Sequence, residues 1–180
     1  TQWTVDVSDN NYAYFADLTV TGNTIYTADD NTVMALNASD GDTRWTYDTV
    51  TDDGDRYVGG DVYGGMAYAS GTLYFGDSSG NVTALNATDG TSEWIREFDL
   101  RWGGFYSPLT VVNGTVYAME GSENTIYALD KDTGNTEWSY SSSSYLSGEP
   151  VVSDGQLYAA GYGELVALGE QDDPPTAEAG

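Results

Sequence analysis

Residues 128–138 of this chain read ALDKDTGNTEW, and the same pattern occurs twice before, as ALNASDGDTRW at residues 35–45 and ALNATDGTSEW at residues 84–94. A shortened copy, Gln2-Trp3, opens the chain, and Ala167-Leu168-Gly169 begins another copy near its end. The closing tryptophans recur at intervals of roughly 40 to 50 residues, which is the size of one unit in a repeat protein. We therefore expect repeated structural units and a functional surface that several units share.

A second landmark precedes each copy of this pattern. It is a glycine, one intervening residue (two in the first copy), an aliphatic residue and a tyrosine, and it ends at Tyr26, Tyr74, Tyr117 and Tyr158. Short runs of β-favouring residues, separated by Gly, Asn, Asp and Ser, fill the space between the landmarks and are typical of strands and turns. One unit resolves into strands at 109–112, 115–119, 125–129 and around 137–140. Four strands in a unit of this length predict a β-propeller blade, and hence an all-β fold of four-stranded antiparallel blades.

The repeat also sets the expected boundaries of the domain. An isolated outer strand (strand D) covers residues 1–8, and the blades cover about 12–50, 62–100, 105–142 and 148–169. The last blade lacks its outer strand, so about four blades form either a portion of a seven- or eight-bladed ring or a small closed ring. Residues 171–180 form an acidic, proline-rich linker.

This unit resembles the pyrroloquinoline-quinone (PQQ) type of β-propeller repeat, which quinoprotein dehydrogenases share with non-enzymatic BamB-like proteins of bacterial outer-membrane assembly. The resemblance covers residues 1–170 and lies in residues 127–130, Thr133-Gly134, Trp138 and their equivalents. It implies that the motif tryptophan of each blade docks against the neighbouring blade, a structural role that we expect for Trp3, Trp45, Trp94 and Trp138. The segment Pro-Pro-Thr-Ala-Glu-Ala-Gly at residues 174–180 resembles the opening of a PKD-type immunoglobulin-like domain.

Composition indicates the medium in which the protein works. The chain has 29 Asp and Glu against five Lys and Arg, for a formal net charge of −24 on 180 residues. Such a charge destabilises a compact fold in dilute buffer, but at 1 M salt the screening length falls to about 3 Å. This balance favours a halophilic, haloarchaeal protein surrounded by inorganic cations. The absence of a basic patch argues against nucleic-acid partners. The absence of a long apolar segment argues against direct membrane insertion.

The absence of histidine and cysteine narrows the chemistry. A histidine base, a cysteine nucleophile and an ordinary zinc site are excluded, so we predict no catalytic residue and no metal site. The resemblance implies that a dehydrogenase would hold PQQ with Ca²⁺, a stacking tryptophan, basic groups and often a vicinal cysteine pair. No residue here matches that set, so we expect no cofactor, although PQQ with calcium is the one that the family would suggest.

The connections between successive blades carry the best candidates for a binding surface. They are rich in aromatic and arginine side chains, which suit a peptide, a sugar chain or an acidic ligand. The alternative is that these side chains pack between blades. The candidate ligand-binding residues are Tyr14, Phe15, Arg56, Tyr63, Arg101, Trp102, Phe105, Tyr106 and Tyr145.

Four Asn-x-Ser/Thr sequons make Asn37, Asn81, Asn86 and Asn113 possible glycosylation sites if the protein is secreted. Together with the acidic composition, they favour an extracellular or cell-surface location.

The sequence thus predicts a non-catalytic, extracellular or cell-surface propeller that acts as a scaffold for a protein or glycan partner in a halophile. One alternative is a portion of a PQQ-dependent dehydrogenase whose catalytic residues lie outside this chain. A second alternative is a carbohydrate-binding module of a secreted hydrolase.

Overall fold

The computed structural model describes residues 3–5, 16–49, 51–52, 57–58, 60–100 and 103–169. The elements assigned in these ranges are all strands, and they form three four-stranded antiparallel sheets, one three-stranded sheet and a short hairpin. The first sheet contains β1 (Thr19–Thr21), β2 (Thr24–Asp29), β3 (Thr32–Asn37) and β4 (Thr43–Asp48). The second contains β7 (Ala67–Ala69), β8 (Thr72–Gly76), β9 (Asn81–Asn86) and β10 (Ser92–Glu97).

The third sheet contains β11 (Thr110–Val112), β12 (Thr115–Glu120), β13 (Thr125–Asp130) and β14 (Thr136–Ser141). The fourth contains β15 (Leu146–Ser153), β16 (Gln156–Gly161) and β17 (Leu165–Gly169). In all four sheets the strands pair in chain order, which is the up-and-down arrangement of a propeller blade. The predicted all-β fold of four-stranded antiparallel blades is therefore confirmed.

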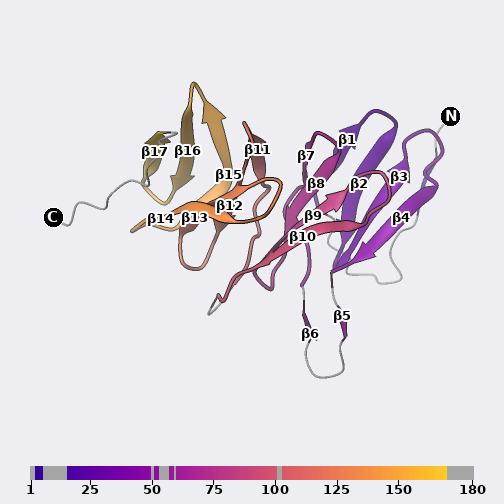
Figure 1. Cartoon of the computed structure of the whole chain (residues 1–180), viewed down its shortest axis with the longest axis horizontal. Helices are drawn as coiled ribbons and strands as arrows, with labels where there is room; N and C mark the ends of the chain where they lie inside the picture. The colour runs from indigo at the N-terminus through magenta and orange to yellow at the C-terminus, as the bar shows by residue number, and fades with distance from the viewer. Residues whose placement is uncertain are drawn as a thin grey trace.

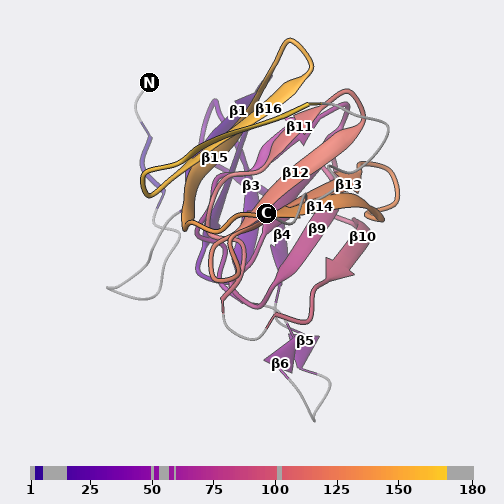
Figure 2. The same cartoon turned by 90° about the vertical axis from the view of Figure 1, so that its left-hand side faces the viewer.

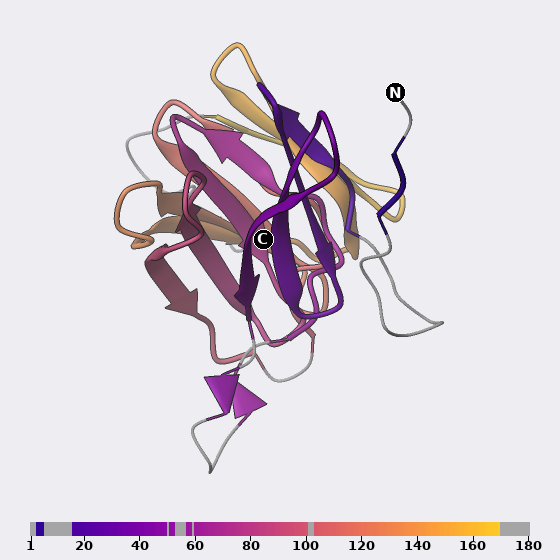
Figure 3. The same ribbon diagram turned by 90° about the vertical axis from the view of Figure 1, so that its right-hand side faces the viewer.

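The sheets follow one another along an open arc (Figure 1), with β1–β4 at one end and β15–β17 at the other. Viewed along the arc, successive sheets lie one behind the next (Figures 2 and 3). The hairpin of β5 (Thr51–Asp52) and β6 (Tyr57–Val58) projects away from the sheets and had no counterpart in the sequence analysis. The described sheets thus form an open arc.

The core consists of layers between successive sheets. One layer joins the first and second sheets around Val33, Leu73 and Phe75, and the next joins the second and third around Val116 and Leu129. A third layer fills the space between the third and fourth sheets. The two central strands of the complete blades therefore bury both of their faces. Their sequences are accordingly short apolar runs and not strict alternations.

The motif tryptophans hold these layers together. The Trp3, Trp45 and Trp94 indole N–H groups donate to the carbonyl oxygens of Ala38 (3.1 Å), Ala87 (3.1 Å) and Lys131 (2.9 Å). Each acceptor lies in the turn before the outer strand of the following sheet. Since each tryptophan spans to the next sheet, the same bond recurs at successive joints.

The glycine of the repeat explains why that turn accepts an indole ring. A Cβ atom on Gly90 would lie 2.7 Å from the Trp45 ring, and one on Gly134 would lie 2.6 Å from the Trp94 ring. Both glycines also have positive φ, at +74° and +69°, a region that side chains disfavour. The repeat thus needs glycine for backbone conformation and for ring contact at once.

Two tyrosines of the second landmark reinforce the joints. The Tyr26 hydroxyl donates to Ala87 O at 3.0 Å, and the Tyr74 hydroxyl donates to Lys131 O at 3.3 Å. Each carbonyl therefore receives a tyrosine and a tryptophan from the same preceding sheet. Trp138 lies 5.9 Å from Tyr117, between ring centroids, and packs against the layer between the third and fourth sheets.

Candidate functional site

One end of the sheets carries both the inter-blade connections and the turns between the two central strands of each blade. Backbone hydrogen bonds join the two kinds of segment: Val62 N–H donates to Asp30 O (2.8 Å), and Phe105 N–H donates to Asp77 O (2.9 Å). Tyr162 N–H likewise donates to Tyr145 O at 2.9 Å. We call this end of the molecule the connection face. The β5–β6 hairpin projects from it (Figure 1), and the tryptophan-binding turns lie at the opposite end.

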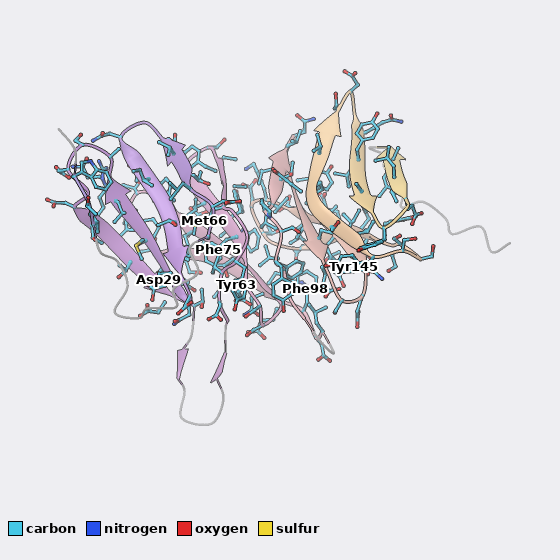
Figure 4. All side chains as sticks on the ribbon, turned by 180° about the vertical axis from the view of Figure 1, so that it is seen from behind. Asp29, Tyr63, Met66, Phe75, Phe98 and Tyr145 are labelled. Carbon is cyan, nitrogen blue, oxygen red and sulfur yellow. The ribbon has the colours of Figure 1, made fainter. Side chains whose placement is uncertain are left out.

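Four partly exposed tyrosines lie on the connection face. Their exposed fractions are 41% for Tyr63, 45% for Tyr106, 51% for Tyr145 and 85% for Tyr162. The ring centroids of Tyr63 and Tyr106 are 5.8 Å apart, and those of Tyr145 and Tyr162 are 6.4 Å apart. We call these four residues the tyrosine row. Figure 4 labels Tyr63 and Tyr145, which lie towards the side from which the β5–β6 hairpin projects.

Gly121 connects the two halves of the row. A Cβ atom at this position would lie 3.8 Å from Cδ2 of Tyr106 and 3.9 Å from the hydroxyl oxygen of Tyr145. Both distances are ordinary van der Waals contacts. Gly121 therefore lies between the Tyr63–Tyr106 pair and the Tyr145–Tyr162 pair of the row.

Carboxylates adjoin the row. The Tyr63 hydroxyl donates to Oδ2 of Asp61 at 2.8 Å. This hydrogen bond, with burial and the nearby charges of Asp61 and Asp30, raises the pKa of Tyr63 to about 12. The phenol is neutral at physiological pH, as an ordinary tyrosine is. Glu164 follows Tyr162 in the β16–β17 turn, and its Oε2 accepts a hydrogen bond from the Ser142 hydroxyl at 2.9 Å.

Two buried carboxylates beneath the face stabilise turns. Asp77 accepts hydrogen bonds from Ser79 N–H (2.8 Å), Asn81 N–H (3.1 Å) and Asn81 Nδ2 (2.9 Å). Burial raises the pKa of Asp77, and the hydrogen bonds from Asn81 and Ser79 oppose that rise. Glu120 accepts from the backbone of Ser122 (2.6 Å) and Glu123 (2.5 Å) in the same way. These carboxylates are thus occupied by their own turns.

The predicted ligand-binding residues divide into three groups. Tyr63, Tyr106 and Tyr145 lie in the tyrosine row. Phe105 is fully buried, and its ring meets that of Phe98 edge-on at 5.3 Å, so it belongs to the core and offers a ligand no exposed surface. The remaining candidates lie outside the described residues: Tyr14, Phe15, Arg56, Arg101 and Trp102.

Sequence reasoning missed Tyr162, the most exposed member of the row. It lies between Gly161 and Gly163 in the β16–β17 turn. A large aromatic residue between two glycines in a turn has little to pack against, and this was the available signal.

Among the sequons, Asn81 is buried and its amide donates to Asp77, so this nitrogen does not meet the requirement for an exposed glycan acceptor. The Asn37 and Asn86 side chains accept hydrogen bonds from the backbone N–H groups of Ser39 and Thr88, whereas Asn113 lies in an exposed turn.

A groove of about 410 Å³ runs along the inner strands. Its lining includes Leu18, Met66 and Leu109, and its charged members are Asp17 and Glu149. The Thr19 hydroxyl donates to Met66 O at 2.5 Å beside this groove and ties the inner strands of the first two sheets together. The groove is therefore lined by apolar side chains together with two carboxylates.

PQQ is a polycarboxylate, and the groove does not fit it. The described residues of the lining supply two carboxylates and no lysine or arginine. A polyanion placed there would face like charges without a compensating cation. In the described part of the chain, no group of three or more Asp or Glu side chains is placed to hold a metal ion. Those same ranges contain no helix long and apolar enough to cross a membrane.

Comparison with known proteins identifies a family to which this chain is similar. The family model described as "Outer membrane protein assembly factor BamB" matches residues 1–101 and 57–173. No curated protein matches the sequence significantly.

Solved structures resemble the fold at low sequence identity. BamB from Moraxella catarrhalis superposes with a TM-score of 0.66 at 20% identity, over 83% of this chain and 47% of that protein. The quinohemoprotein alcohol dehydrogenase from Comamonas testosteroni gives a TM-score of 0.67 at 20% identity, over 80% of this chain and 28% of the enzyme. The computationally designed Ika4 protein gives 0.70 at 11% identity, over 93% of this chain and 96% of its own. The chain thus spans about half of one natural relative and less than a third of the other.

Proposed function

Because this chain belongs to the BamB family of β-propeller proteins, we propose that it is a non-catalytic scaffold that binds a partner at its connection face. The proposed location is the cell surface or the exterior of an organism adapted to high salt. The net charge of −24 supports this setting, because dissolved salt screens the mutual repulsion of the carboxylates. The PKD-like reading of residues 174–180, which lie outside the described ranges, remains a prediction.

The tyrosine row is the observation that carries the proposal. Exposed aromatic side chains in contact with one another are unusual on a freely soluble surface and are enriched where proteins bind ligands or partners. The joint aromatics are already engaged: the hydroxyl of Tyr74 and the indole N–H of Trp94, for example, share one acceptor on the next sheet. The rings of the row, by contrast, remain accessible on a face that three blades build together.

Photo-crosslinking in the cells that produce the protein tests this function. A benzophenone amino acid replaces Tyr106 in one variant and Tyr68, which is 41% exposed on β7, in the control. We expect a discrete adduct of higher mass from position 106 and none from position 68. Adducts at neither position, or equal adducts at both, would contradict the proposed function.

A second candidate is a portion of a PQQ-dependent dehydrogenase, favoured by the structural similarity to the quinohemoprotein enzyme. Titration of the folded chain with PQQ and Ca²⁺ in about 2 M salt, where surface charge is screened, distinguishes the two. The scaffold proposal expects no saturable change in tryptophan fluorescence or heat. Stoichiometric binding of PQQ would favour the dehydrogenase proposal over the scaffold proposal.

A further inference from the structure

The spacing of the tyrosine row matches an extended peptide. The ring centroids within each pair are 5.8 Å apart for Tyr63–Tyr106 and 6.4 Å apart for Tyr145–Tyr162. An extended chain advances about 3.3 Å per residue and presents alternate side chains to one side, which places them about 6.6 Å apart. Successive side chains on one side of an extended segment can therefore each meet one ring of a pair.

The charges near the row are negative. Asp61 accepts the Tyr63 hydroxyl, Asp30 acts on the same ring electrostatically, and Glu164 lies two residues after Tyr162. These carboxylates are separate from the buried Asp77 and Glu120, which their own turns already engage. An occupant of the row therefore meets carboxylates beside aromatic rings.

Among the described residues, no cation forms an ion pair with these carboxylates. The Arg44 guanidinium donates to Asn23 O, and the Lys131 ammonium pairs with Asp132, both at the opposite end of the sheets. The Arg96 guanidinium lies 5.4 Å from the centroid of the Phe98 ring. Arg56 and Arg101 lie outside the described residues. Rings with adjacent carboxylates attract arginine and lysine side chains through cation–π and ionic contacts together.

We propose that the tyrosine row binds an extended, arginine- or lysine-rich segment of a partner protein. This inference rests on the proposed scaffold function and adds the chemical class of the partner. Charge complementarity selects a cationic peptide over a neutral sugar chain, since a sugar would use the rings and leave the carboxylates without a counter-charge. Electrostatic complementarity of this kind contributes specificity and association rate.

The test uses the full chain and an alternating Arg–Ser peptide of about eight residues, long enough to reach both rings of either pair at two residues per ring. Binding is measured by fluorescence anisotropy in about 0.5 M NaCl, so that the general attraction between a basic peptide and an acidic protein is screened. Gly121→Lys places a positive charge in the middle of the row, and Gly121→Glu places a negative one. Gly121 has an ordinary φ and room for a Cβ, so both variants are expected to fold.

Thr88→Lys provides the matched control, because Thr88 is exposed in the turn at the opposite end of the second sheet. We expect Gly121→Lys to weaken binding by about tenfold, which corresponds to about 1.4 kcal/mol, with Gly121→Glu and Thr88→Lys close to the parent. Equal weakening by Lys and Glu at position 121 would overturn the proposal, because it would show obstruction without a charge effect. Equal weakening by Lys at positions 121 and 88 would also overturn it.

Two further probes separate failure of this inference from failure of the scaffold function. Binding of a Glu–Ser peptide as tight as that of the Arg–Ser peptide would contradict a cationic partner. Saturable binding of cellohexaose that Gly121→Lys and Gly121→Glu weaken equally would replace the peptide with a glycan and leave the binding function standing. A crosslink at position 106 in cells, without binding of the Arg–Ser peptide, would refute this inference alone.

Discussion

Tyrosine side chains have two different roles in two regions of this molecule. At the blade joints, Tyr26 and Tyr74 are buried, and each hydroxyl donates to a carbonyl of the following sheet. On the connection face, Tyr63 and Tyr106 contact each other and keep more than a third of their surface exposed. The joint tyrosines recur with the repeat because each blade must dock on the next. Position within the repeat, and not the residue type, therefore decides which aromatics serve the fold and which remain available for binding.

The largest expected effect comes from filling a tryptophan-binding turn. Gly90→Ala places a Cβ atom 2.7 Å from the Trp45 ring at a φ of +74°. We expect this overlap and strain together to lower the free energy of unfolding by about 3 kcal/mol or more. Gly71→Ala is the control, since Gly71 has a φ of +94° but no atom within 4 Å of the new Cβ; its strain alone costs about 1 kcal/mol. Urea unfolding measures both. Equal losses would show that the ring contact contributes nothing.

The shared carbonyl at a joint gives the next largest effect. Trp94→Phe removes one donor to Lys131 O and part of the buried ring, for an expected loss of about 2 kcal/mol. Tyr74→Phe removes the other donor and leaves the tryptophan in place, for about 1 kcal/mol or less. The double variant is expected to lose more than the sum, since the carbonyl then has neither partner. Strict additivity in this double-mutant cycle would mean that the two donors act independently.

The smallest effect concerns the titration of the connection face. Asp61→Asn removes the carboxylate that accepts the Tyr63 hydroxyl, so the pKa of Tyr63 should fall from about 12 towards the ordinary value of 10.0. In the parent, the folded pKa lies above the unfolded one. The associated stability is therefore present below pH 10.0 and is lost as the pH rises through about 12.

Tyrosinate absorbance, recorded as the difference between each chain and its Tyr63→Phe counterpart, reads this single group. An unchanged titration in Asp61→Asn would show that the hydrogen bond does not form in solution.

The sequence predicted the joints between blades far better than it predicted the residues exposed on the connection face. The pattern ending at Trp45, Trp94 and Trp138 repeats because every joint has the same geometric requirement, so the blade architecture was legible from spacing alone. The connections carry no such period. Phe105 and Tyr106 are neighbours in the chain, yet the Phe105 N–H donates to Asp77 O and its ring lies in the core, while Tyr106 is exposed.

No pattern in a single irregular segment distinguishes those two side chains, because backbone pairing with a distant turn decides which one faces inward. The same limit explains why the buried Phe105 was listed beside Tyr106 as a ligand-binding candidate and why Tyr162 was missed. The contact between Tyr145 and Tyr162 forms only when β15 and β16 pair. The tyrosine row is thus a tertiary feature, whereas the joint is a local motif used repeatedly.

The most direct measurement of the central claim is the affinity of Tyr106→Leu for the Arg–Ser peptide, set against that of Tyr68→Leu. Both positions are partly exposed tyrosines, and Leu keeps apolar bulk while removing the aromatic face. We predict that Tyr106→Leu binds about tenfold more weakly, a difference of about 1.4 kcal/mol, at an unfolding free energy close to that of the parent chain. Equal peptide affinity in the two variants would contradict the assignment of the connection face as the binding surface.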